Sequence, residues 1–208
     1  MNVVLFGASG MIGSRVLQEL LSRGHHVTAV ARNPEKVTNA GVKTVKGDVN
    51  NEANVAAIAE GADVVISAIA PPQGHEEDLV NSTKALLAGM KRAGANRVIV
   101  VGGAGSLEVA PGVQLVNVPN FPAEYKAIAI AHRDALAVVK ESDLDWTYLS
   151  PAAVITPGER TGKFRLGGTK LVADAKGESR ISAEDYAVVL VDELEHPKHL
   201  RQQFTAAY

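Results

Sequence analysis

Cysteine is absent from the 208 residues of this chain. Its absence excludes disulfide bonds, thiolate metal sites and a cysteine nucleophile. Aromatic residues make up only 4 % and the net charge is −2 at pH 7, so nothing indicates a dedicated nucleic-acid surface. Long hydrophobic runs are also missing, because the apolar stretch 3–6 is too short for a signal sequence or a membrane span. We therefore expect a cytoplasmic protein with no nucleic-acid or membrane partner, and no metal site.

Apolar segments alternate with amphipathic ones along most of the chain. Apolar residues make up 46 %, enough for one sizeable core. Strands that alternate with helices predict an α/β fold with a parallel sheet. We predict one domain over residues 1–208, with the Gly- and Pro-rich segment 151–180 as a small cap on the substrate side. The expected strands are 2–6, 26–31, 43–46, 63–67, 97–101, 146–149 and 203–206, and the expected helices are 12–23, 51–60, 76–93, 123–141 and 182–195.

Three glycines separate the first strand from the first helix. Gly7 permits a tight turn, Gly10 allows the backbone to approach a pyrophosphate, and Gly13 allows the helix to pack closely on the sheet. The free N–H groups of the helix N-terminus would then face the phosphates. The strand, turn and helix context predicts dinucleotide binding, and the alternative is a plain strand-to-helix turn.

The end of the second expected strand indicates which dinucleotide is bound. An acidic residue that binds the NAD ribose usually stands there, but this chain has Arg32 instead. A guanidinium can bind a 2′-phosphate in a bidentate manner, so NADP(H) is preferred over NAD(H). The alternative is that Arg32 is a solvated loop residue. Arg15 is a second candidate for the same phosphate, or else a surface residue, and Lys36 is a weaker third.

Two further strand ends carry candidate cofactor contacts. Asp48 could accept a hydrogen bond from the adenine amino group, or it could cap the next helix. The small residues of the 67–71 segment would let the backbone lie against the riboses of the cofactor.

In this order, the motifs resemble those of the atypical short-chain dehydrogenases/reductases, and most of all their NmrA-like and flavin/biliverdin-reductase-like branch. The resemblance covers essentially the whole chain and includes segments 100–106, 143–151, 157–162 and 181–186. It implies a Rossmann-type doubly wound parallel sheet with a small C-terminal cap. By this resemblance, Gly7, Ser9, Gly10, Met11 and Ile12 line the pyrophosphate, Arg32 meets the 2′-phosphate, Asp48 and Val49 contact adenine, Ala68, Ile69 and Ala70 flank the ribose, Gly102 and Gly103 open the site near the nicotinamide, and Pro151 and Ala152 pack near its carboxamide.

The usual proton-transfer pair of this superfamily, Tyr-x-x-x-Lys, is incomplete. Tyr125 is present, but Ala129 stands four residues on and the lysine is displaced to Lys126. Adjacent residues of a helix do not share a face, so Lys126 cannot simply replace the missing lysine. Two other candidates for proton transfer or substrate contact are His132, two turns along the same helix, and Ser106, after the fifth strand. The alternatives are a half-buried or surface histidine and a turn serine.

These features support one leading function and two alternatives. The leading hypothesis is an NADP(H)-binding oxidoreductase that passes hydride to a small acceptor such as a flavin, a quinone or a carbonyl compound. The incomplete proton-transfer pair also fits a non-catalytic NADP(H) redox sensor. A nucleotide-sugar epimerase or dehydratase is a third and weaker alternative, because the segment after residue 150 is small for a sugar-nucleotide lobe.

Overall fold

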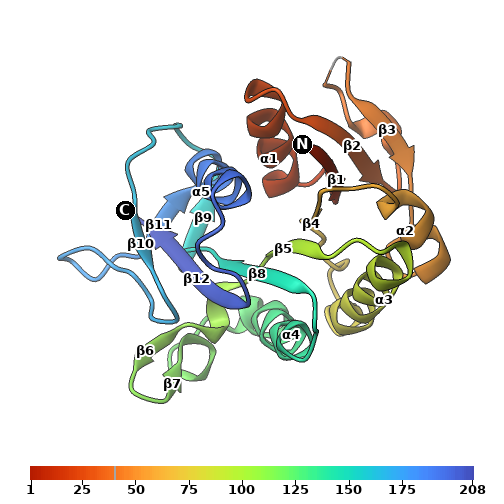
Figure 1. Cartoon of the computed structure of the whole chain (residues 1–208). Coiled ribbons are helices and arrows are strands. Elements are labelled where there is room, and N and C mark those ends of the chain that lie inside the picture. Colours follow the sequence, from red (N-terminus) through yellow and green to blue (C-terminus); the bar gives the residue numbers. More distant parts are fainter. Residues whose placement is uncertain (40) are drawn as a thin grey trace.

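The computed structural model describes residues 1–39 and 41–208. Among them, eight strands form the main sheet in the order β10-β12-β8-β5-β4-β1-β2-β3 (Figure 1). Neighbouring strands are parallel, except that β10 runs antiparallel to β12. The order steps outward in both directions from β1, as in a doubly wound sheet, except that β10 lies outside β12 at one edge. The strands are β1 (Asn2–Phe6), β2 (His26–Ala31), β3 (Lys43–Lys46), β4 (Val64–Ser67), β5 (Arg97–Val101), β8 (Asp145–Ser150), β10 (Arg165–Gly167) and β12 (Gln202–Ala207).

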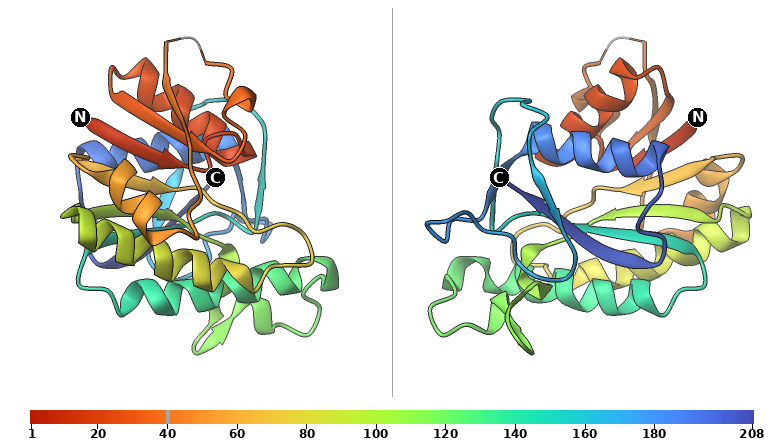
Figure 2. Two further views of the ribbon diagram at one scale, coloured as in Figure 1. Left: turned by 90° about the vertical axis from the view of Figure 1, so that its right-hand side faces the viewer. Right: turned by 60° about the vertical axis from the view of Figure 1, so that its left-hand side comes forward.

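Helices cover both faces of this sheet (Figure 2). Helices α1 (Met11–Ser22) and α5 (Ala183–Glu195) pack on one face. Helices α2 (Glu52–Ala59), α3 (Asp78–Ala93) and α4 (Ala123–Lys140) pack on the other. The predicted Rossmann-type α/β fold is therefore confirmed. In the described part of the chain, no helix has the length and the apolar character needed to cross a membrane.

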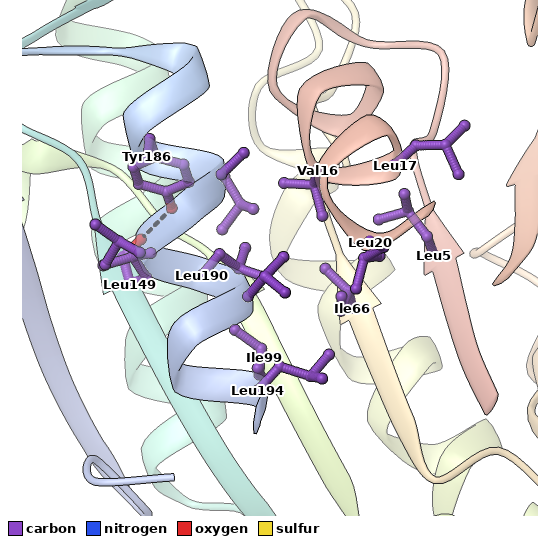
Figure 3. Close-up of a cluster of buried hydrophobic side chains, with 14 of the residues drawn as sticks. Leu5, Val16, Leu17, Leu20, Ile66, Ile99, Leu149, Tyr186, Leu190 and Leu194 are labelled. Atoms are coloured by element: carbon purple, nitrogen blue, oxygen red, sulfur yellow. Dashed lines mark hydrogen bonds between the residues drawn. The ribbon is translucent and has the colours of Figure 1, made fainter. Parts of the chain in front are cut away.

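Side chains alternate between two cores, because successive residues of a strand point to opposite faces. On β1, Val3 and Leu5 join the core under α1 and α5, whereas Val4 and Phe6 join the core under α2, α3 and α4. Figure 3 shows the first core, in which leucines of α1 and α5 meet between the two helices. Both faces of each central strand are buried, which explains why these strands read as continuous apolar runs.

Two predicted helix starts have different outcomes. The Oγ of Ser182 accepts a hydrogen bond from the amide of Asp185 at 2.9 Å, so Ser182 is the N-cap of α5 and the expected start of the helix 182–195 is confirmed. The capping alternative for Asp48 is wrong, because Asn51 is the N-cap of α2 and its side chain accepts from the amide of Asn54 at 3.0 Å. Asp48 instead accepts from the amide of Asn50 at 2.9 Å and closes a short turn.

Several short elements escape the sequence pattern. They have two or three residues each, too few to show an apolar period. Besides β10 at the edge of the main sheet, the strands are β6 (Glu108–Ala110), β7 (Val113–Gln114), β9 (Val154–Thr156) and β11 (Arg180–Ser182), and the 3-10 turns are η1 (Pro34–Lys36), η2 (Ala104–Ser106) and η3 (Leu115–Asn117). β9 pairs in parallel with β11, so the segment after β8 returns to the start of α5.

Candidate functional site

Two of the three N-terminal glycines are required by the packing of the turn itself. Gly7 has a φ of +82°, and a Cβ on it would lie 2.3 Å from the carbonyl oxygen of Ala68. A Cβ on Gly13 would lie 2.0 Å from the carbonyl oxygen of Gly7. Real Cβ atoms do not approach backbone oxygen so closely, so any side chain at either position would displace the β1 turn or α1.

Gly10 differs from the other two, because the chain itself leaves room for a side chain there. Its φ of −74° and ψ of 170° suit any residue. A Cβ would approach only the carbonyl oxygen of Gly7, at 3.4 Å. Gly10 is the N-cap of α1, and the first turn of that helix carries no acidic side chain. Gly10 thus puts no side chain in front of the free amides of α1, which is where a diphosphate would bind.

A cavity of about 290 Å³ lies beside this turn, at the carboxyl ends of β1, β2, β3 and β4. Ligands of open α/β sheets bind at this end, so we take this cavity as the site. A larger hollow, of about 610 Å³, lies at the opposite end near Asn2 and His26. Nine of the residues expected to bind cofactor line the smaller cavity: Gly7, Ser9, Gly10, Arg32, Asp48, Val49, Ala68, Ile69 and Ala70.

The three candidate cations for a 2′-phosphate have different surroundings. Arg32 is exposed at the rim of the cavity, and no ion-pair partner for it is found in residues 1–39 and 41–208. Arg15 is engaged by Glu184, with Nε 3.0 Å from Oε1, and it also donates to the carbonyl of Met11. Lys36 is exposed on η1 and does not line the cavity. Arg32 is thus the cation that the fold leaves available to the ligand.

The residues expected near the nicotinamide lie outside this cavity. Pro151 and Ala152 are buried just after β8. A Cβ on Gly102 would lie 2.1 Å from the ring of Tyr148, and one on Gly103 would lie 2.8 Å from Cβ of His132. These two glycines therefore have a packing role, and their opening of the nicotinamide site stays a prediction. Met11, which is 41 % exposed, and Ile12 lie in the first turn of α1.

The three candidates for proton transfer lie in three different environments. Tyr125 is 60 % exposed near the start of α4. Ser106 is buried, and its Oγ accepts a hydrogen bond from Nε2 of Gln203 at 2.8 Å. His132 packs beneath Gly103, and burial lowers its pKa to about 4. Of the three, only Tyr125 is freely accessible, and the catalytic roles of all three stay predictions.

The low pKa of His132 predicts a specific dependence of stability on pH. The imidazole has a pKa of 6.5 in the unfolded chain and about 4 in the fold, so the unfolded state binds the proton more tightly between these values. Stability is then fully present above pH 6.5 and falls as the pH drops toward 4. We expect the melting temperature of His132→Asn to fall less steeply between pH 6.5 and pH 4 than that of the unchanged protein. Parallel curves would contradict the assignment, and His75→Asn, at an exposed histidine, is the control.

The segment 157–163 is bound to α1 and α5. The guanidinium of Arg160 donates two hydrogen bonds to Glu19 at 2.8 Å, and the amide of Gly158 donates to Glu184 at 2.7 Å. Thr161 Oγ1 and the amide of Gly162 donate to Asp185 at 2.6 and 2.8 Å. The motifs 157–162 and 181–186 of the sequence therefore bind each other.

We expect Asp185→Asn to loosen this segment. Asp185 is fully buried. Burial raises its pKa, but hydrogen bonds from Thr161, Gly162 and Tyr208 outweigh this effect and hold the pKa below its usual value. Losing the charged acceptor is expected to cost about 2 to 4 kcal/mol of unfolding free energy, measurable by denaturant titration, and to expose the segment to proteolysis. Asp134→Asn, at a surface ion pair, should change stability by less than about 0.5 kcal/mol; an equal loss in both variants would refute the prediction.

Three polar residues of the cavity wall were not predicted from the sequence: Asn50, Ser82 and Asp78, which is the first residue of α3. Asn50 follows β3 and Ser82 lies on α3, and both line the cavity. No motif marks any of the three. The one sequence signal was the position of Asn50, two residues after Asp48, whereas Ser82 reaches the site only because α3 packs beside the loop after β3.

Known proteins resemble this chain in sequence and in fold. A family model described as NAD(P)H-binding matches residues 7–197. YwnB of Bacillus subtilis, itself uncharacterised, is 40 % identical over 209 residues, which cover 99 % of this chain and 97 % of YwnB. A solved structure from Burkholderia pseudomallei, provisionally named an exported protein, is 52 % identical, covers all of both chains and has a TM-score of 0.93.

A third relative carries the name of an activity. This Streptococcus pneumoniae protein, provisionally named an NADH-flavin reductase, is 31 % identical, with a TM-score of 0.86 and coverage of 100 % of this chain and 99 % of that one. The family model spans most of the sequence, and it includes both the glycine turn and α5. The chain therefore belongs to the NAD(P)H-binding family, in agreement with the resemblance of its motifs to the atypical short-chain dehydrogenases/reductases.

Proposed function

We propose that this protein is an NADP(H)-dependent oxidoreductase that passes hydride to a small acceptor: a flavin, a quinone or a carbonyl compound. The observation that carries the proposal is the cavity between the glycine turn and Arg32, with the amides of α1 uncovered by any side chain at Gly10. The cofactor supplies the hydride, and the protein supplies binding, orientation and shelter from water. We also propose that the protein is located in the cytoplasm.

The preference for NADP(H) is supported by charge at the rim of the cavity. Arg32 follows β2, and no acidic residue stands at that strand end to bind a free ribose 2′-hydroxyl. The guanidinium can form two parallel hydrogen bonds to a 2′-phosphate. Arg15 does not compete for this phosphate in our proposal, because Glu184 neutralises it.

The class of acceptor is supported by the proton-transfer groups. Ala129 stands where the superfamily places a lysine, and it is buried against η2. His132 is neutral at pH 7 because burial lowers its pKa to about 4. A flavin or quinone can take its proton from solvent, so such an acceptor needs little help from these side chains. The small cap 151–180, carried by β9 and by the contacts of segment 157–163, would bound the acceptor site.

Stopped-flow absorbance of the purified protein tests this proposal. We expect oxidation of NADPH when a flavin, a quinone or a small carbonyl compound is added, with NADH oxidised less efficiently. The absence of turnover with every acceptor of such a panel would count against an oxidoreductase.

The incomplete Tyr-x-x-x-Lys pair also favours a second candidate, a non-catalytic redox sensor that binds NADP(H) and signals through a partner protein. The same assay separates the two. A sensor would bind NADPH without consuming it, and the bound nucleotide would alter association with a partner in pull-down experiments.

A further inference from the structure

We propose that a further cavity, beside the end of α5, is a binding site for a small aromatic carboxylate, whose acidic end is held by His199 and Lys198. The cavity has a volume of about 260 Å³ and lies between the last turns of α5 and the strands β10 and β12 (Figure 1). None of its lining residues lines the cavity at the glycine turn. The inference is therefore independent of the proposed function.

The imidazole of His199 is held in one orientation by Glu193. Glu193 is 4 % exposed near the end of α5, and its Oε2 lies 2.7 Å from Nδ1 of His199. The same carboxylate accepts hydrogen bonds from the amides of Lys198 and His199. Because a carboxylate that is surrounded by donors acts as an acceptor, Nδ1 carries the hydrogen between the two side chains. The other ring nitrogen, Nε2, is left for a ligand.

Nε2 of His199 is accessible and unpaired. No partner for it is found in residues 1–39 and 41–208. In the same part of the chain, Nε of Arg97 is the only side-chain nitrogen or oxygen that is buried without a partner, so Nε2 is not buried. The ring lies flat on Phe204, with the ring centres 3.9 Å apart and an angle of 2° between the planes. Stacking and the bond to Glu193 thus fix an unused imidazole nitrogen at the cavity wall.

The charges around the cavity favour an anionic ligand. The acidic side chains of its wall are already engaged, Asp192 by Arg23 at 2.7 Å and Glu193 by His199. Lys198 also lines the cavity, and its ammonium group has no ion-pair partner among the residues that the structure describes. A carboxylate can accept from this ammonium group and from Nε2 of a protonated His199, which takes its proton from solvent. Glu193, behind the ring, stabilises that imidazolium.

The remaining wall of the cavity is apolar and suits a flat ring. Phe164 and Leu166 line it from β10 and the segment before it, Val189 from α5 and Phe204 from β12. Leu166 is 52 % exposed, so the chain leaves this apolar surface uncovered. An aromatic ring gains from offset or edge-to-face contacts with phenylalanine. The cavity is smaller than those that hold drug-sized ligands, and we therefore expect a single ring with a short acidic side chain.

Binding of phenylacetate to the full-length protein, measured by calorimetry and by ligand-observed NMR, tests this inference. We expect phenylacetate to bind about tenfold or more tightly than phenylacetamide, which has the ring without the charge, and than acetate, which has the charge without the ring. His199→Asn keeps a donor near the position of Nδ1 and removes Nε2, so the affinity should fall about tenfold. Leu166→Glu places a carboxylate in the wall and should abolish binding.

Leu200→Glu is the matched control for the wall variant, because Leu200 is 45 % exposed and does not line the cavity. It should keep the affinity of the unchanged protein. If His199→Asn does not fold, as judged by its melting curve, Lys198→Gln takes its place, because Lys198 is exposed and its backbone amide still donates to Glu193. It should also weaken phenylacetate.

Three results would overturn the inference: no binding of phenylacetate, equal binding of phenylacetate and either control compound, or unchanged binding in both Leu166→Glu and the variant at the acidic end. NADPH affinity should be the same in all these variants, because the two cavities share no residue. Failure of the unchanged protein to bind NADPH would overturn the proposed function alone.

Discussion

Replacing Gly10 by valine is expected to abolish the binding of both NADPH and NADH while the fold persists. The backbone at Gly10 accepts any residue, and its Cβ would meet only the carbonyl oxygen of Gly7, at 3.4 Å. The branched side chain would instead fill the space before the amides of α1. The phosphates of the nucleotide would then lose their hydrogen bonds from these amides. Losing two hydrogen bonds to a charged phosphate lowers the affinity by a factor of at least about a hundred. Calorimetric titration measures this loss, and circular dichroism checks the fold.

Two further glycine variants make the result specific. Gly10→Ala adds a single carbon and should give an intermediate affinity. Gly13→Ala should instead destabilise the protein, because its Cβ would lie 2.0 Å from the carbonyl oxygen of Gly7. The assignment would be wrong if Gly10→Val bound either nucleotide as tightly as the unchanged protein.

Arg32→Glu is expected to weaken NADPH about tenfold to a hundredfold and to leave NADH nearly unchanged. The guanidinium at the cavity rim is available to a 2′-phosphate, which NADH lacks. Glutamate removes the charge-assisted hydrogen bonds and adds repulsion of the dianion. The ratio of the two dissociation constants, measured at one fixed ionic strength, reports the effect, because exposed charges are screened by salt.

Arg92→Glu provides the matched control for this experiment. Arg92 is exposed in the last turn of α3, far along that helix from the residues that line the cavity, and the variant makes the same change in net charge. It should leave both affinities unchanged. If Arg32→Glu altered NADPH and NADH equally, the 2′-phosphate would have to be bound elsewhere.

The parts of the fold that could be predicted were those with a long apolar period. Strands such as β1 and β5 and the helices α1 to α5 are read from their patterns, and their ends agree with the expected ranges to within about two residues. The short strands β6, β7, β9, β10 and β11 could not be predicted in this way, because two or three residues carry no period. In addition, β9 pairs with β11 and β10 pairs with β12, and both partners are distant in sequence.

The site divides in a similar way. Gly7, Gly10 and Gly13 were recognisable because turn chemistry is local. By contrast, Glu184 binds Arg15 across 169 positions of the sequence, and this contact decides between Arg15 and Arg32 as the free cation. Likewise, Asp48 was recognisable as a polar residue at a strand end, but only the hydrogen bond from the amide of Asn54 to Oδ1 of Asn51 shows that another residue caps α2.

The sequence by itself thus determined the α/β class, the glycine turn between β1 and α1 and the cation at the end of β2, since each depends on residues close together in the chain. Only the tertiary structure decided which polar groups are already occupied: Arg15 by Glu184, Asp185 by segment 157–163, and Asn50 by Ser82. The physical reason is that a hydrogen bond or an ion pair depends on distance in space, and folding brings these partners together from different helices and loops.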